Sequence, residues 1–221
     1  FRRLPLPSET PPPAPDPPYS GIMRRRFARF AWFVLAVQIL VILWGAYVRA
    51  SKSGAGCGEH WPLCNGQVLP TAPPLPMLIE FTHRASSGVA LILAIALYVL
   101  ARRWHSKSQP IRTASGWVLT LMVVEAPLGA GLVIFGLVDK DDSVKRVIAM
   151  SLHLINTFAL LAALTRAAQA GRGAPALQTG GHGVAGWVLL TMLAALPVLG
   201  VTGAIAALGD TLFPAKSLAE G

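Results

Sequence analysis

The chain has 221 residues, of which 53% are hydrophobic and only 13% are charged, and its mean hydropathy is +0.55. An ordinary soluble domain carries about twice that share of charge. The composition therefore excludes a conventional soluble enzyme and indicates an integral membrane protein. The formal net charge is +9, but the cations lie in short clusters between apolar runs. That arrangement is typical of membrane topology signals, so we do not expect a nucleic-acid partner.

A proline-rich segment precedes the first apolar run. Residues 4–18 contain eight prolines, and such a composition predicts a disordered tail, which we assign to residues 1–22.

Five apolar runs follow, at residues 27–48, 77–101, 111–138, 147–165 and 184–208. Each is close to or above the roughly 20 helical residues that cross about 30 Å of hydrocarbon. A backbone in lipid must satisfy its own hydrogen bonds, so the runs are helices. The sequence thus predicts an all-α integral membrane protein, an up-down four-helix transmembrane bundle plus a fifth transmembrane helix. The four-helix half is expected at residues 23–168, a cytoplasmic linker at 169–183 and the fifth helix within 184–221.

The basic residues predict the orientation. They cluster before the first run, after the second and after the fourth, as Arg24, Arg25, Arg26, Arg29, Arg102, Arg103, Lys107, Arg112, Arg166 and Arg172. The positive-inside rule then places the N-terminus in the cytoplasm and the loop between the first two helices outside a multi-pass cell membrane. That outer loop carries Cys57 and Cys64, and an oxidising location permits a disulfide between them. A structural staple and a redox pair that exchanges electrons with an outside thiol both remain open.

Two histidines lie at the same expected depth. His83 is six residues after Met77 and His153 is six residues after Val147, which places both roughly 9 Å below the outer boundary. The second and fourth helices of an up-down bundle are parallel and diagonal, so both imidazoles can face its centre. Such a pair can supply the two axial ligands of a haem iron. The alternative is two helix-end histidines that bond the backbone or lipid headgroups.

Three further charged residues accompany the histidines. Glu80 shares a helix face with His83, where it could relay protons near a haem; the alternative is a helix-N-terminal charge favoured by the macrodipole. Arg84 could pair with Glu80 or bind a haem propionate. Glu125, two residues before Pro127, is either a functional intramembrane acid or a protonated acid that bonds a carbonyl freed by the proline.

Several motifs resemble a known family. The segments Gly-Ala-Tyr-Val-Arg-Ala-Ser-Lys-Ser-Gly-Ala-Gly-Cys at 45–57 and Trp-Pro-Leu-Cys-Asn-Gly at 61–66 resemble the first outer loop of haem A synthases. The run Glu-Phe-Thr-His-Arg at 80–84 and the pair His-Leu at 153–154 are similar to the same family. The resemblance covers about residues 27–214 and implies an oxidoreductase that oxidises the C8 methyl of haem O to a formyl group, giving haem A.

The resemblance also implies a set of site residues: the catalytic carboxylate Glu80, the haem site residues His83, His153 and Arg84, with both histidines on the iron, and the loop pair Cys57 and Cys64. Family members usually have two four-helix halves, the second holding a b-type haem, and only the first helix of that half is expected here. The chain thus resembles a fragment or a half-sized variant, with Glu125 standing where a Gln would be expected.

The implied partners are membrane lipid, haem O, a haem O synthase, terminal oxidase assembly and a second copy of the chain. The residues alone leave two other functions open. One is a b-type electron-transfer cytochrome that uses the same histidines, and the other is a membrane thiol oxidoreductase built on Cys57 and Cys64.

Overall fold

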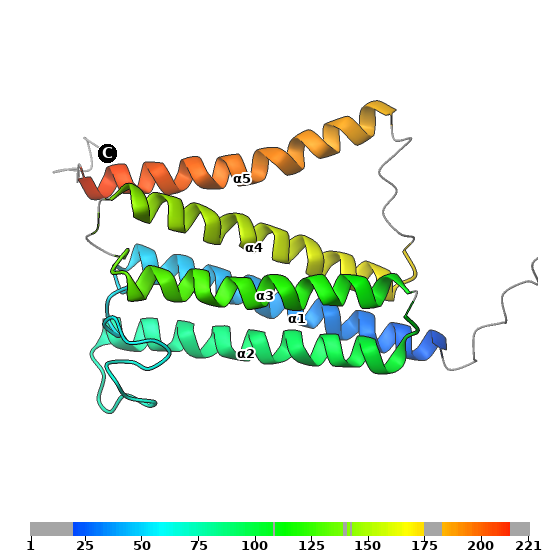
Figure 1. Cartoon of the computed structure of the whole chain (residues 1–221), viewed down its shortest axis with the longest axis horizontal. Helices are drawn as coiled ribbons and strands as arrows, with labels where there is room; N and C mark the ends of the chain where they lie inside the picture. Colours follow the sequence, from blue (N-terminus) through cyan, green and yellow to red (C-terminus); the bar gives the residue numbers. More distant parts are fainter. Residues whose placement is uncertain (1–19, 108, 139–140, 142, 175–182, 213–221) are drawn as a thin grey trace, which may run out of the picture.

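The computed structural model describes residues 20–107, 109–138, 141, 143–174 and 183–212. Five helices follow one another along the chain: α1 (Ser20–Ala50), α2 (Leu75–Trp104), α3 (Pro110–Ile134), α4 (Val144–Gly171) and α5 (Gly183–Leu212). They lie side by side and alternate in direction (Figure 1). Of the predicted disordered tail, residues 1–19 lie outside the described residues, and the last three belong to α1. Residues 175–182 of the predicted linker and 213–221 at the C-terminus also lie outside them.

Four of the helices are long and apolar enough to cross a membrane: Gly21–Ala50, Leu75–Trp104, Pro110–Ile134 and Val144–Gly171. This confirms the prediction of an all-helical, multi-pass membrane protein. The apolar part of α5 among the described residues is shorter, Leu190–Gly203. The fifth transmembrane span therefore stays a prediction.

Two helices begin or end at other residues than their apolar runs, because turn and capping residues determine these helix ends. α3 ends at Ile134, four residues before the end of its run, because Gly136 turns the chain with φ of 63°. Glycine adopts that left-handed conformation without a steric cost. α4 begins three residues earlier than its run, since the side chain of Ser143 accepts a hydrogen bond from the Arg146 N–H (3.3 Å) and caps the first turn.

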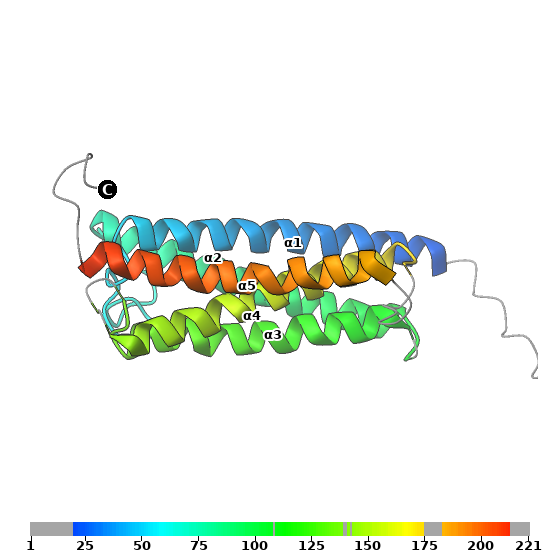
Figure 2. The same ribbon diagram turned by 90° about the horizontal axis from the view of Figure 1, so that it is seen from above.

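The first four helices form a closed ring. Contacts join α1 to α2, α2 to α3, α3 to α4 and α4 back to α1, and among the described residues none joins α1 to α3 or α2 to α4. α2 and α4 are thus diagonal, as the up-down arrangement predicts. The ring closes tightly, because a Cβ added at Gly171 of α4 would lie 2.9 Å from Cα of Ala28 on α1. Within the described part of the chain α5 packs on α4 alone. Figure 2 shows the ribbon from above, with α5 in front of the ring.

The bundle has two chemically different ends. The disulfide end carries the α1–α2 loop (51–74) and the α3–α4 loop, and the arginine end carries the start of α1, the α2–α3 connection and the end of α4 (Figure 1). Between the two ends most of the buried side chains are apolar, the largest fully buried ones being Phe27, Leu97, Ile111, Val118, Leu160 and Leu164.

His105, which caps α2 at the arginine end, predicts a pH-dependent stability. Its ring lies edge-on to Phe27 of α1, with 5.6 Å between ring centroids. Burial lowers the pKa of His105, Gln109 acts in the opposite direction, and the charge of Arg24 on α1 lowers that pKa further. From α3, Arg112 donates to the carbonyl of His105 (3.4 Å). Because the pKa is lower in the folded state, that state binds fewer protons, and stability should fall as the pH falls below about 6.5.

The measurement is the thermal unfolding midpoint of the purified protein in detergent between about pH 7.5 and pH 5. In the His105→Phe variant the unfolding midpoint should depend less on pH than in the wild type. If the midpoint of the variant falls with pH as steeply as that of the wild type, His105 is not the source of the pH dependence.

Candidate functional site

The α1–α2 loop folds onto the start of α2 and contains the predicted disulfide. Cys57 and Cys64 are bonded and both at most 1% exposed. The loop approaches α2 so closely that a Cβ at Gly56 would lie 2.6 Å from the carbonyl oxygen of Pro76. Only glycine permits this approach. The disulfide expected from the sequence is therefore confirmed, as a small ring of residues 57–64 set against α2.

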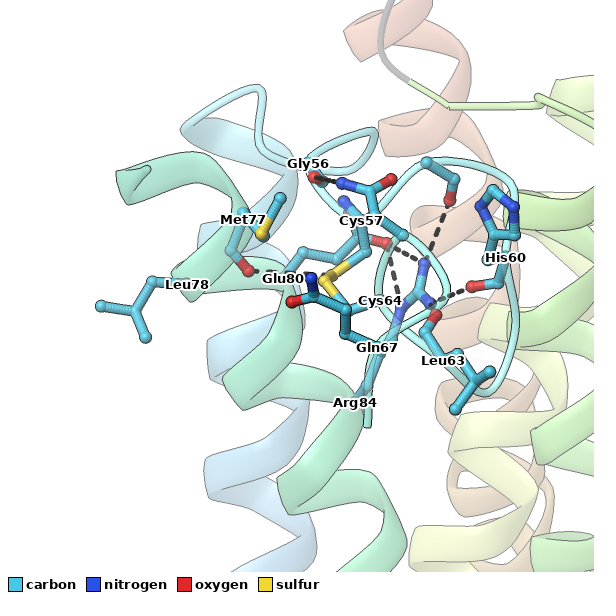
Figure 3. The surroundings of a disulfide bond; sticks show 12 residues. Gly56, Cys57, His60, Leu63, Cys64, Gln67, Met77, Leu78, Glu80 and Arg84 are labelled. Carbon is cyan, nitrogen blue, oxygen red and sulfur yellow. Dashed lines mark hydrogen bonds and ion pairs between the residues drawn. A yellow bond between two sulfur atoms is a disulfide. The ribbon is translucent and has the colours of Figure 1, made fainter. Parts of the chain in front are cut away.

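Glu80 and Arg84 fasten this ring to α2. The Glu80 carboxylate, 3% exposed, accepts the Cys57 N–H (2.7 Å) and pairs with Nη2 of Arg84 (2.5 Å). Arg84 in turn donates to the carbonyl oxygens of His60 (2.5 Å) and Leu63 (2.7 Å). Figure 3 shows the guanidinium at the centre of these bonds. We call this arrangement the Glu80–Arg84 clamp.

The pairing of Glu80 with Arg84 is one of the two roles that the sequence leaves open for Arg84, and their spacing of four residues on α2 permits it. The bonds from Arg84 to the loop were not expected. They end on backbone carbonyls, which leave no signature in the sequence.

The two candidate haem ligands lie within the bundle, on diagonal helices. His83 is eight residues after the first residue of α2 and His153 is nine residues after the first residue of α4, so their depths differ by about 1.5 Å. The two imidazoles are close enough to interact electrostatically. The structure thus brings them to a common level, as the sequence predicts.

Glycines of the neighbouring helices lie beside both rings, and Gly45 makes room for the ring of His83. A Cβ at Gly45 of α1 would lie 2.8 Å from Cε1 of His83, and one at Gly129 of α3 would lie 3.5 Å from Cε1 of His153. Nδ1 of each histidine is buried, and within the described part of the chain it has no hydrogen-bond partner. A buried imidazole nitrogen without a partner is costly in an apolar bundle. The two half-buried histidines fit a haem site, because imidazole is a usual axial ligand of haem iron.

A polar cluster adjoins His153. The Glu125 carboxylate of α3 accepts hydrogen bonds from Asn156 Nδ2 (2.5 Å) and from Thr157 Oγ1 of α4, and its Oε1 lies 3.6 Å from Nδ1 of His153. Among the described residues its carboxyl makes no bond to a carbonyl freed by Pro127, which was one of the two interpretations of this acid. Sequence reasoning missed Asn156 and Thr157. Their positions three and four residues after His153 put them on its helix face and could have revealed them.

Comparison with known proteins identifies the family. The family model described as COX15-CtaA, cytochrome oxidase assembly protein, matches residues 28–220. The chain is 48% identical over 195 residues to a protohaem IX farnesyltransferase of Thermus thermophilus, a match that covers 88% of this chain and 32% of that protein.

Haem A synthases are also similar. Those of Exiguobacterium sibiricum and Halalkalibacterium halodurans are each 34% identical, over 113 and 114 residues, and the matches cover 51% and 52% of this chain and 38% of each relative. The chain thus spans about a third of the length of the curated relatives it matches. No solved structure matches it. On the family match over most of its length, the chain belongs to the COX15-CtaA family of cytochrome oxidase assembly proteins, the haem A synthases, which are oxidoreductases.

Proposed function

We propose that this chain forms the haem O-binding half of a haem A synthase, in which the C8 methyl of haem O is oxidised to a formyl group. The observation that carries the proposal is the pair of half-buried imidazoles, His83 and His153, each with a buried and unpartnered Nδ1, at one depth on diagonal helices. Family membership supports it independently. A bound haem supplies the redox chemistry, and the protein supplies ligands, orientation and a site poor in water.

The residues would share this work as follows. His83 and His153 would hold the iron, and Gly45 leaves the space that the His83 ring needs. The Glu80–Arg84 clamp keeps the disulfide ring over the site and excludes water. Glu80 would be the catalytic carboxylate, able to take a proton, and Arg84, besides its bonds within the clamp, would bind a haem propionate.

The wider assembly belongs to the same proposal. α5 is a fifth transmembrane span, the N-terminus is cytoplasmic and the disulfide end is outside. A b-type haem is expected in a second four-helix half. The similarity to a protohaem IX farnesyltransferase three times as long supports a haem O synthase as the source of the substrate, in the same polypeptide or as a partner. Terminal oxidase assembly and a second copy of the chain are further partners of the proposal.

Pigment extraction tests this function. The chain is expressed in cells that also express a haem O synthase, and the extracted haems are separated by chromatography. Haem A in the extract supports the proposal, with at most one haem held by this chain. Haem b alone would favour the electron-transfer cytochrome instead, and purified protein without any haem would favour the thiol oxidoreductase.

Replacing Gly45 with Ala is expected to lower the haem content. The added methyl would lie 2.8 Å from Cε1 of His83 and push the ring out of place, at a cost of about 1–3 kcal/mol for overpacking. The measurement is the haem-to-protein ratio. The matched control is Gly88→Ala on α2, where nothing lies within 4 Å of the added Cβ. Equal haem content in both variants would contradict the placement of His83 at the haem.

We also propose that Glu125 is a positioning residue for His153. A small rotation of the imidazole would close the 3.6 Å gap and let Nδ1–H donate to the carboxylate, leaving Nε2 for the iron. Such hydrogen bonds fix the tautomer of a metal-ligating histidine and make its other ring nitrogen a stronger electron donor to the metal. Glu125→Leu should therefore raise the haem midpoint potential. Glu125→Gln, which keeps an acceptor, should move it less. Identical potentials in the two variants and the wild type would contradict this role.

A further inference from the structure

A pocket opens at the arginine end, far from the haem site. It has a volume of about 400 Å³ and is lined by Arg25, Ala28, Arg29, Trp32 and Arg172. The α1 residues recur at helical spacing, so they share one face of that helix. The end of α4 brings Arg172 to the same face. The close contact between Ala28 and Gly171 fixes the two helices against each other at this point.

The pocket is strongly cationic and lacks a carboxylate of its own. Arg25 and Arg29 are exposed and pair with no acid among the described residues, and the Arg172 guanidinium lies 5.2 Å from the centre of the Trp32 ring. The acids whose side chains the structure describes are elsewhere, with Glu59, Glu80 and Asp141 at the disulfide end and Glu125 beyond the middle of α3. Three guanidinium groups around one cavity repel each other, and an anion between them would relieve that repulsion.

Trp32 and the exposed leucines of α1 indicate which kind of anion this pocket binds. Tryptophan favours the membrane interface. The indole N–H of Trp32 is buried, and the described part of the chain offers it no acceptor. Leu40 and Leu43 lie 11 and 14 residues after Arg29, on nearly the same side of α1 at 100° per residue. They are 65% and 61% exposed, so an apolar stripe runs from the pocket into the hydrocarbon. A free phosphate would not use this stripe, whereas acyl chains would.

We propose that this pocket binds the phosphate headgroup of an anionic phospholipid, whose acyl chains lie along Leu40 and Leu43. The arginines supply charge-assisted bonds to the phosphate oxygens, and the stripe supplies apolar contact. The proposal does not depend on the haem A synthase activity. It assigns the arginine end a specific ligand in addition to the topology signal that its cations provide.

The test is lipid retention by the full chain. The protein is reconstituted in nanodiscs of mixed phosphatidylglycerol and phosphatidylcholine, released, and analysed by native mass spectrometry for bound lipid. The pocket variant is Arg25→Gln, Arg29→Gln and Arg172→Gln together. The matched control is Arg26→Gln, Arg102→Gln and Arg103→Gln together, which removes the same charge at the same end but outside the pocket. Circular dichroism and size exclusion confirm that both variants fold.

The wild type and the control should retain phosphatidylglycerol in preference to phosphatidylcholine. In the pocket variant the ratio of retained phosphatidylglycerol to phosphatidylcholine should be about tenfold lower. Equal retention by the wild type and the pocket variant would overturn the proposal. So would an equal loss in the control, because it would show a general effect of charge. Inorganic phosphate binding without retained phosphatidylglycerol would also overturn it, since the pocket would then take the free ion.

Discussion

Replacing His83 or His153 with Ala is expected to remove most of the bound haem and to abolish haem A formation. Each side chain would supply one of the two protein ligands of the iron, and the described residues place no other histidine within the bundle at their level. Changing a residue that merely supports a metal ligand typically lowers metal affinity by about 10–100-fold. Loss of the ligand itself should cost at least as much. The measurements are the haem-to-protein ratio and the optical spectrum of the purified variants.

The matched control is His60→Ala. His60 is an exposed loop residue whose carbonyl, and not its ring, binds Arg84. This variant should keep its haem. Added imidazole should restore part of the haem spectrum in the His83 and His153 variants, since it can occupy the space that the shortened side chain leaves. An unchanged spectrum in both alanine variants would remove the two histidines from the iron.

Breaking the Glu80–Arg84 clamp is expected to have the second-largest effect. Arg84→Gln leaves a buried carboxylate without its cation, and removing one partner of a buried pair typically costs about 3–5 kcal/mol. The loop also loses its bonds at His60 and Leu63. The disulfide should then be reduced faster by an added thiol, which mass spectrometry after alkylation can follow over time. The thermal unfolding midpoint should fall as well.

Comparison with Glu80→Gln separates anchoring from catalysis. The amide can still bond the Cys57 N–H or face Arg84, but it cannot take a proton. We expect it to keep haem and to slow turnover. If Arg84→Gln slows turnover as much as Glu80→Gln while the carboxylate is intact, the role of Glu80 is to hold the loop. The control is Glu59→Gln, an exposed acid of the same loop, which should leave both the reduction rate and turnover unchanged.

Much of this arrangement follows from local properties of the sequence. Run length and hydropathy predict α1 to α4, and alternation of direction makes α2 and α4 diagonal. The common depth of His83 and His153 then needs only a count along each helix. The sequence also offers the pairing of Glu80 with Arg84, as one of two roles for Arg84.

The contacts that the sequence does not reveal involve backbone groups or residues that are far apart along the chain. The carbonyls that Arg84 binds belong to residues of any type. The meeting of Glu125 with Asn156 joins positions 31 residues apart and depends on how α3 and α4 rotate about their axes. The space beside His83 comes from Gly45, whose role is visible only when α1 lies against α2. Patterns within one helix specify which face is apolar, and packing decides which side chains meet.

The tight closure of α1 on α4 has a consequence for biosynthesis. Ala28 and Gly171 are separated by 143 positions, so their contact forms only after the last turn of the fourth helix has left the ribosome and entered the bilayer. Until then the hairpin of α1 and α2 has one side facing lipid. A ligand shared by α2 and α4 has no complete binding site during this time. Loading of such a ligand must therefore follow membrane insertion of the whole ring and cannot accompany synthesis of its first helices.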